Sequence, residues 1–317
     1  MTATSQYLPV ECQEWVGGPV VSSEAEVQTP PPAPVAPLVP RWRRGRTLSD
    51  GTVLHWWKQI IAVLAVYAVY ELVRSRAVSG AGKAFDNALL IIDIQKVLGI
   101  NHELAIQEWS LHFRPLIIAA NYFYGSAYLI VTFAVIVWLY RRRSDAYPLW
   151  RNTLAFLTTL GLLGFALFPL MPPRLLDTLG DGRTFGFVDT LFEYPTFWNF
   201  NSEGMRTVSN PFAAMPSLHC AWAFWAACAL YPRVRSNWAR GLAVAYPVVT
   251  VYVVVATGNH YLLDAVGGAI VFGVGYGLAR VVTKAGRGRP LSERDDEHDD
   301  NIVDQPERVP YRAIAAR

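Results

Sequence analysis

Two histidines and an aspartate stand at the edges of apolar runs. His219 lies in MPSLHCAWAFW (residues 215–225), and His260 and Asp264 lie in TGNHYLLDAV (residues 257–266). The i,i+4 spacing places His260 and Asp264 on one face of a helix, one turn apart. A carboxylate in this position can accept the Nδ1 proton of the imidazole, which leaves Nε2 as a nucleophile or base. The pattern predicts acid–base or nucleophilic chemistry at His260.

A second set of residues is suited to hold an anion beside His219. Ser217 follows Pro216 directly before an apolar run, and serine is a favoured N-cap residue. The free backbone N–H groups at a helix start bind phosphate. Arg174, in MPPRLL, carries a guanidinium that can bind the same phosphate through two hydrogen bonds. These residues together predict a phosphate held between two histidines.

Each of these residues also has other interpretations. Ionisable groups at apolar edges are functional candidates, but a histidine at a helix end is often a packing residue. Asp264 could cap its helix, and Arg174 could anchor the chain at the membrane surface. Two histidines with a carboxylate could also form a facial triad that binds a metal ion. Treatment with a strong chelator would separate a metal enzyme from a phosphohistidine enzyme.

The composition indicates a membrane protein. Of the 317 residues, 52% are hydrophobic and 17% are charged, whereas soluble domains carry about 25% charged residues. The three cysteines, Cys12, Cys220 and Cys228, show no pattern of a disulfide framework or a zinc site. We expect the bilayer as a partner and no binding of nucleic acid. The sequence leaves the oligomeric state open.

Six apolar segments predict an all-α, polytopic membrane helical bundle, because a membrane-crossing helix needs roughly 20 apolar residues. The expected spans are residues 55–77, 116–140, 148–169, 213–231, 239–257 and 261–283. In the last span, small residues recur every four positions, and we expect this stripe to serve helix packing only. The stripe consists of Ala265, Ala269, Gly273 and Gly277.

Basic residues orient the six spans. RWRRGR (41–46), RRR (141–143), PRVRSNWAR (232–240) and the basic residues of segment 280–289 all fall on one side of the membrane. The positive-inside rule makes this the cytoplasmic side of a multi-pass cell membrane protein. Both termini are then cytoplasmic, and the two histidines lie near the extracytoplasmic surface.

We expect three regions along the chain. Residues 1–50 form a disordered Pro-rich arm, residues 51–284 form the six-helix membrane domain, and residues 285–317 form a disordered charged tail. Within the membrane domain, residues 79–114 are expected to form one or two short amphipathic helices in the interface, or a re-entrant cap. The aromatic-rich residues 170–212 suit the headgroup level, either as an aromatic belt or near the substrate.

The two histidine segments resemble a known family. MPSLH and GNHYLLD resemble the second and third signature motifs of the type 2 phosphatidic acid phosphatase (PAP2) superfamily, and the resemblance covers roughly residues 55–283. MPPRLL resembles the PPR element of the branch that contains inositolphosphotransferases of the inositol phosphorylceramide synthase type. The chain departs from the usual third motif at Val254, where that motif has an arginine. It also lacks the lysine-to-Arg-Pro spacing of the first motif.

The resemblance implies a PAP2-like fold and a role for each site residue. His260 is the nucleophile that attacks phosphorus, Asp264 orients it, and His219 protonates the leaving group. The residues that hold the phosphate are Arg174, Ser217 and Asn259. The phosphohistidine then passes its phosphoryl group to inositol or another alcohol. The resemblance therefore implies a phosphotransferase with a membrane lipid substrate, either a lipid phosphate or a phospholipid headgroup, and with no cofactor and no metal. Water as the acceptor would give a lipid phosphate phosphatase, and a non-catalytic lipid-binding protein is the further alternative.

Overall fold

The structure is a computed structural model that describes residues 46–49, 53–61, 64, 68, 80–194, 196 and 211–287. The chain divides into two units after Arg43, and all of the described residues belong to the second unit. Most of the expected Pro-rich arm, most of the first expected span and the charged tail from residue 288 onward lie outside the described residues.

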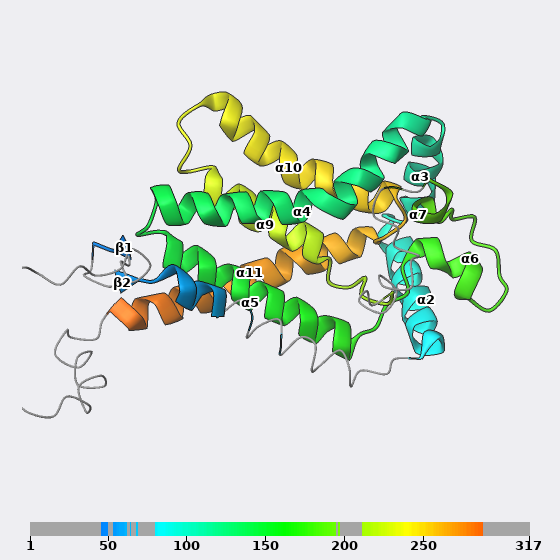
Figure 1. The fold of residues 1–317 in the computed structure, drawn as a ribbon. Coiled ribbons are helices and arrows are strands. Elements are labelled where there is room, and N and C mark those ends of the chain that lie inside the picture. The colour runs from blue at the N-terminus through cyan, green and yellow to red at the C-terminus, as the bar shows by residue number, and fades with distance from the viewer. Residues whose placement is uncertain are drawn as a thin grey trace, which may run out of the picture. The chain divides into compact units, whose positions relative to one another are not determined.

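The described part of the chain is mostly helical, which agrees with the expected fold class. A short antiparallel hairpin joins β1 (Arg46–Thr47) to β2 (Val53–Leu54), and Arg46 pairs with Leu54. The longer helices are α2 (Ala81–Leu98), α4 (Arg114–Arg142), α5 (Tyr147–Leu167), α9 (Leu218–Leu230), α10 (Asn237–Ala256) and α11 (Leu262–Arg287) (Figure 1). The shorter ones are α3 (Glu103–Leu111), the 3-10 helix η2 (Pro173–Leu175), α6 (Leu176–Leu179) and α7 (Thr190–Glu193).

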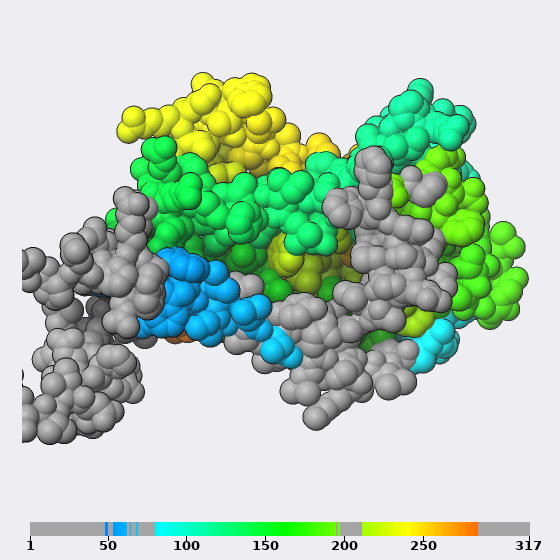
Figure 2. Space-filling model, in the orientation of Figure 1, coloured from blue at the N-terminus to red at the C-terminus, as the bar shows by residue number. Residues whose placement is uncertain are grey.

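Three of the described helices are long and apolar enough to cross a membrane. They are α4, α10 and the Leu262–Lys284 part of α11. Large apolar side chains on α4 and α10, such as Phe133 and Val248, are exposed, and atoms of both helices lie at the surface in Figure 2. The sequence predicted six spans. The length and composition of the described helices support three of them.

Two further expected spans are not among these three helices. Helix α5 has 21 residues, but Arg151 and Asn152 lie in its first turns and lower its mean hydropathy. Helix α9 has only 13 residues, because Pro216 lies outside the helix and Ser217 is its N-cap. Thirteen residues extend roughly 20 Å, less than the roughly 30 Å hydrocarbon core. Helix α9 is therefore a short helix, and His219 lies in its first turn.

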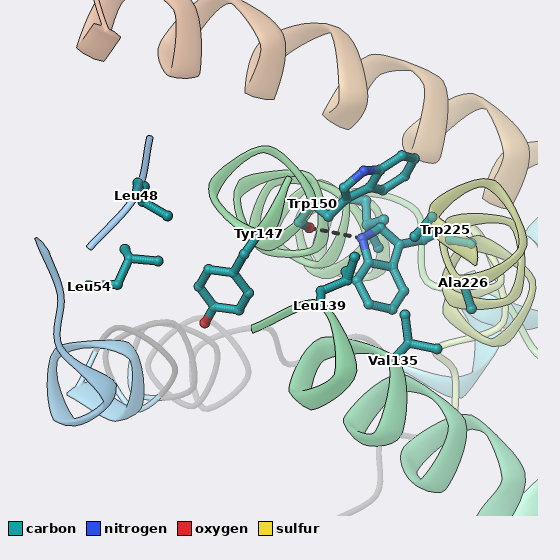
Figure 3. Packing of buried hydrophobic residues seen from close by; sticks show 11 residues of the cluster. Leu48, Leu54, Val135, Leu139, Tyr147, Trp150, Trp225 and Ala226 are labelled. Carbon is teal, nitrogen blue, oxygen red and sulfur yellow. Dashed lines mark hydrogen bonds between the residues drawn. The ribbon is translucent and has the colours of Figure 1, made fainter. Parts of the chain in front are cut away.

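Helix α9 packs against α4, α5, α10 and α11 and is largely buried. Its Trp225 is fully buried, and the indole Nε1 donates a hydrogen bond to the backbone oxygen of Trp150 at 2.9 Å (Figure 3). Val135 and Leu139 of α4 belong to the same apolar cluster. This cluster fixes α9 in the middle of the other long helices.

The expected small-residue stripe on α11 is only partly a packing surface, because Ala265 is buried in an apolar cluster while other members of the stripe are exposed. Ala269 is exposed, and a Cβ at Gly273 or Gly277 would meet nothing within 4 Å among the described residues. The close contacts of α11 with α5 and with the start of α9 are made by glycines on a different face of α11. A Cβ at Gly268 would lie 2.6 Å from the backbone oxygen of Ser217, and one at Gly275 would lie 2.8 Å from the backbone nitrogen of Leu157. Small residues therefore do permit close packing, but at positions that the four-residue repeat missed.

Helices α2, α3, α6 and α7 gather at one end of the other long helices, and the β1–β2 hairpin lies at the opposite end (Figure 1). Residues 79–114, expected to form one or two helices, form α2 and α3 and continue into α4. Gly99, whose φ is 69°, ends α2 in the left-handed conformation. Residues 170–194 contain η2, α6 and α7, while residues 197–210 of the expected aromatic connection lie outside the described part.

The basic loops meet at the end opposite to the short helices. The Arg143 Nη2 atom donates to the backbone oxygen of Arg233 at 3.4 Å, which joins the end of α4 to the loop between α9 and α10. Asn152 at the start of α5 donates to Thr283 near the end of α11 at 3.2 Å. His219 at the start of α9 and Asp264 in the first turn of α11 are at the other ends of their helices.

Candidate active site

His260 lies in a tight turn between α10 and α11. The turn includes Gly258, whose φ of 68° is unfavourable for residues with a side chain. A Cβ at Gly258 would also lie 2.7 Å from the Nε2 atom of Gln107. The backbone oxygen of Gly258 accepts a hydrogen bond from the Arg174 N–H at 2.9 Å. The turn therefore brings the Arg174 backbone to the residues that directly precede His260.

The Nδ1 atom of His260 faces two acceptors. It lies 2.8 Å from the backbone oxygen of Ala214 and 3.2 Å from Oδ2 of Asp264. A carbonyl oxygen can only accept, so Nδ1 must carry the proton, and the Nε2 of the neutral ring keeps its lone pair. The ring is buried, and this burial lowers the pKa of His260 below its usual value. The imidazole is therefore in the neutral form that a nucleophile requires.

Asp264 is fully buried at the start of α11 and makes a second local contact. Its Oδ2 accepts a hydrogen bond from the backbone N–H of Tyr261 at 2.9 Å. This is the reciprocal half of a capping box, in which the third residue of a helix reaches back to the N-cap amide. The two interpretations of Asp264, as a partner of His260 and as a helix cap, therefore hold at the same time.

His219 lies in the first turn of α9, directly beside His260. The two ring centroids are 5.7 Å apart and the rings are inclined at 64°. Tyr124 stacks on His219 with centroids 4.5 Å apart, and Tyr128 contacts it edge-on at the same distance. Both tyrosines lie on α4, one turn apart, so α4 holds the His219 ring against the site.

Ser217 is the N-cap of α9, as the sequence predicted. Its side-chain oxygen accepts a long hydrogen bond of 3.4 Å from the Cys220 N–H, and the residue is fully buried. The Ser217 backbone N–H donates to the backbone oxygen of Asp264 at 2.9 Å. This bond joins the start of α9 to the first turn of α11 and so fixes the distance between the two histidines.

Arg174 and Asn259 contact each other beside His260. The Arg174 Nε donates to Oδ1 of Asn259 at 2.9 Å, and its Nη1 donates to Oδ2 of Asp189 at 2.8 Å. The Asn259 side-chain amide donates to Oγ1 of Thr257 at 2.8 Å. Asn259 thus orients the guanidinium, and Arg174 is held from two sides rather than extended into solvent.

The structure thus brings all six predicted site residues to one end of the bundle. A comparison with protein families finds that the model of the PAP2 superfamily matches residues 89–278, which is more than half of the chain. The chain belongs to the PAP2 superfamily. No curated protein and no solved structure gave a match.

Membership of the PAP2 superfamily agrees with the three apolar helices in indicating a membrane protein. PAP2 proteins are generally phosphatases or phosphotransferases, so membership also supports an enzyme. The matched residues extend from the middle of α2 to the last third of α11 and contain all six predicted site residues. The family match is to the superfamily as a whole and does not select the inositolphosphotransferase branch.

Several polar residues that contact the candidate site residues or their neighbours were missed by the sequence analysis. Asp189 was not distinguished from other residues of the long aromatic connection. Glu103 and Gln95 lay in a segment that was interpreted only as amphipathic. Gln107 exchanges two hydrogen bonds with the Val188 backbone, at 2.9 and 3.1 Å, and thereby holds the loop that carries Asp189. Such residues could be recognised as polar side chains on the buried face of a helix. The folded structure is needed to know which face is buried.

The alternative of a metal site finds no ligand set in the described part of the chain. Within the described residues, no three His, Cys, Asp or Glu side chains are grouped so that they could hold a metal ion. Asp264 faces the Nδ1 edge of His260, so the carboxylate serves the histidine instead of adding a third ligand beside the two rings.

Proposed function

We propose that this PAP2 protein is an integral membrane phosphotransferase of the inositolphosphotransferase type. It acts on lipid phosphates or phospholipid headgroups through a phosphohistidine at His260. The observation that carries the proposal is the fixed tautomer of His260, whose Nδ1 faces the Ala214 carbonyl and Asp264 while the His219 ring lies beside it.

In the first half of the reaction, the His260 Nε2 lone pair forms a bond to phosphorus. The bond between phosphorus and the leaving oxygen breaks, and protonated His219 gives its proton to that oxygen. The His260 ring becomes positively charged because it keeps the Nδ1 proton. The Asp264 carboxylate at 3.2 Å stabilises this charge.

In the second half, the hydroxyl of an alcohol attacks the phosphohistidine. His219, now neutral, takes the hydroxyl proton, a new phosphorus–oxygen bond forms and the phosphorus–nitrogen bond to His260 breaks. Both histidines return to their starting state, so the cycle balances. Arg174 and the amides at the start of α9 are suited to hold the charged phosphoryl oxygens throughout.

We place the site at the extracytoplasmic surface of a cell membrane protein with six spans and two cytoplasmic termini. The location of basic residues supports this orientation, since the loops with Arg143 and Arg233 meet at the end of the helices opposite to His219. The positive-inside rule assigns such loops to the cytoplasm.

The test measures turnover of purified protein in bilayer discs. Phosphatidic acid and phosphatidylinositol are supplied as donors, with and without free inositol, and both free phosphate and transferred phosphoryl groups are measured. We expect transfer in the wild-type protein and its loss in His260→Ala. The exposed His102 provides the matched control, and His102→Ala should retain activity.

The outcomes separate the alternatives. Release of free phosphate without transfer would replace the phosphotransferase by a phosphatase. Lipid binding without any turnover would identify a non-catalytic lipid-binding protein. Turnover that persists in His260→Ala would disprove the phosphohistidine.

A further inference from the structure

The first backbone amides of α11, immediately after His260, are satisfied by side chains from two other helices. The first amides of a helix have no partner within it. The Leu262 N–H donates to Oε1 of Glu103 at 2.8 Å, and the Leu263 N–H donates to Oε1 of Gln95 at 3.0 Å. Together with the contact of Asp264 to the Tyr261 N–H, these bonds account for three consecutive amides after His260.

Glu103 and Gln95 are both buried, which makes these contacts significant. Glu103 is 1% exposed and Gln95 is 0% exposed. Burying such groups is unfavourable unless they are hydrogen-bonded. A carboxylate also interacts favourably with the positive end of a helix dipole. Among the described residues the Nε2 atom of Gln95 has no partner, so its contact with Leu263 is the one that holds this side chain.

Apolar packing fixes both side chains relative to the site. Ile91 and Ile92 of α2, one turn before Gln95, share a buried cluster with Tyr261, the residue that follows His260. Ile106 of α3, one turn after Glu103, packs against a cluster that includes Ala265. Helices α2 and α3 therefore reach the start of α11 through both apolar and polar contacts.

We infer that Glu103 and Gln95 are positioning residues for His260, because they fix the start of α11 and thereby the turn that carries the nucleophile. The role as positioning residues rests on the proposed function, whereas the cap itself is a property of the fold. Glu103 and Gln95 act through the backbone of Leu262 and Leu263 and do not touch the reacting atoms. A displacement of about 1 Å of a reacting group can cost a factor of about 100 in rate.

The experiment compares four variants in bilayer discs. Glu103→Ala removes the acceptor, Glu103→Gln keeps an oxygen in the same place, and Gln95→Ala removes the second acceptor. Glu108→Gln is the matched control, because Glu108 lies on the same helix and is exposed. Hydrogen exchange of the peptide that contains Leu262 and Leu263 is measured with kcat and KM for phosphatidic acid.

We expect Glu103→Ala to speed exchange at Leu262 by about tenfold, since a bond to a charged acceptor is lost. Its kcat should fall by about 10- to 100-fold with KM within about twofold, because the nucleophile is displaced while the phosphate contacts remain. Glu103→Gln should recover most of both losses. Gln95→Ala should show a smaller loss of the same kind and serves as the second test if Glu103→Ala does not fold.

Two results would overturn the inference. In the first, the wild-type protein is active, and the Glu103→Ala and Gln95→Ala variants have the same kcat as the Glu108→Gln control. The other is a loss in Glu103→Ala that matches its loss of folded protein and that Glu103→Gln does not reverse. A wild-type protein without turnover would instead refute the proposed function, and the exchange measurement would still show whether the cap exists.

Discussion

The Nδ1 atom of His260 lies 2.8 Å from the backbone oxygen of Ala214, a residue 46 positions earlier in the chain. This contact is shorter than the 3.2 Å contact to Asp264. The carbonyl can only accept a hydrogen bond, so the loop before α9 itself fixes the tautomer of His260. In the proposed mechanism, the carboxylate of Asp264 then has a different task, which is to stabilise positive charge on the ring during the reaction.

This division of tasks predicts a limited effect of Asp264→Asn. The amide oxygen can still accept from the Tyr261 N–H, and Ala214 still fixes the tautomer. We expect kcat to fall by about 10- to 100-fold, because a hydrogen bond to a charged group contributes about 1.5–3 kcal/mol. That is less than the roughly 10⁴-fold loss that a wrong histidine tautomer causes. Steady-state kinetics on phosphatidic acid measure the change, and complete inactivation in a folded variant would contradict it.

The role of His219 as the general acid predicts a dependence on the leaving group. His219→Ala should lower kcat for phosphatidic acid by about 10²- to 10⁴-fold. For an aryl phosphate, whose phenolate leaves without a proton, kcat of the same variant should fall much less. The measurement is the ratio of the two rates in wild-type protein and variant. An equal loss on both substrates would assign His219 a structural role through its contacts with Tyr124 and Tyr128.

Arg174 is held by two separate contacts that a lysine cannot reproduce. Arg174→Lys loses the planar fork that reaches Asn259 and Asp189 together. We expect KM for phosphatidic acid to rise by about tenfold or more, since a hydrogen bond to a charged group is worth about 1.5–3 kcal/mol. Arg183→Lys is the control, because Arg183 lies on the same connection in an exposed ion pair with Asp181. Equal KM values in the two variants would contradict a phosphate-binding role for Arg174.

The contact between α9 and α11 predicts different effects of two glycine substitutions on the same helix. Gly268→Ala places a Cβ 2.6 Å from the Ser217 oxygen and must push the start of α9 away from α11. We expect it to be destabilising by about 1–3 kcal/mol and to separate the two histidines. Gly273→Ala has nothing within 4 Å among the described residues and should be neutral or slightly stabilising. Thermal unfolding and turnover of both variants test this, and equal stability would refute the close contact.

The proposed chemistry also predicts the response to metal removal. Histidine, arginine and helix amides supply the nucleophile, the acid and the phosphate contacts, so activity should persist in excess EDTA. Turnover is compared before and after dialysis against the chelator. A loss of activity that added Mg²⁺ or Zn²⁺ restores would favour the metal alternative over the phosphohistidine.

Local sequence patterns were reliable for contacts between residues a few positions apart, although His260 lies in the turn before α11 and not on the helix that its spacing predicted. The spacing of His260 and Asp264 predicted their contact, and Pro216 before Ser217 predicted the N-cap of α9. The small-residue stripe on α11 was only partly informative, since Ala265 is buried and Ala269 is exposed. A repeat of four residues shows that one face is smooth, but it does not show which face meets a neighbour, and the close contacts were made at Gly268 and Gly275.

The sequence by itself determined the apolar character of the long helices, the two histidine segments and the carboxylate that one of them carries. These features depend on residue types and on the fixed 3.6-residue period of a helix. Only the tertiary structure decided that Ala214 holds Nδ1 of His260, that Asp189 holds Arg174 and that Glu103 caps the helix after His260. The Glu103 contact joins residues 159 positions apart. Contacts at such separations depend on how α2, α3 and α11 pack, and no local period of the sequence encodes that packing.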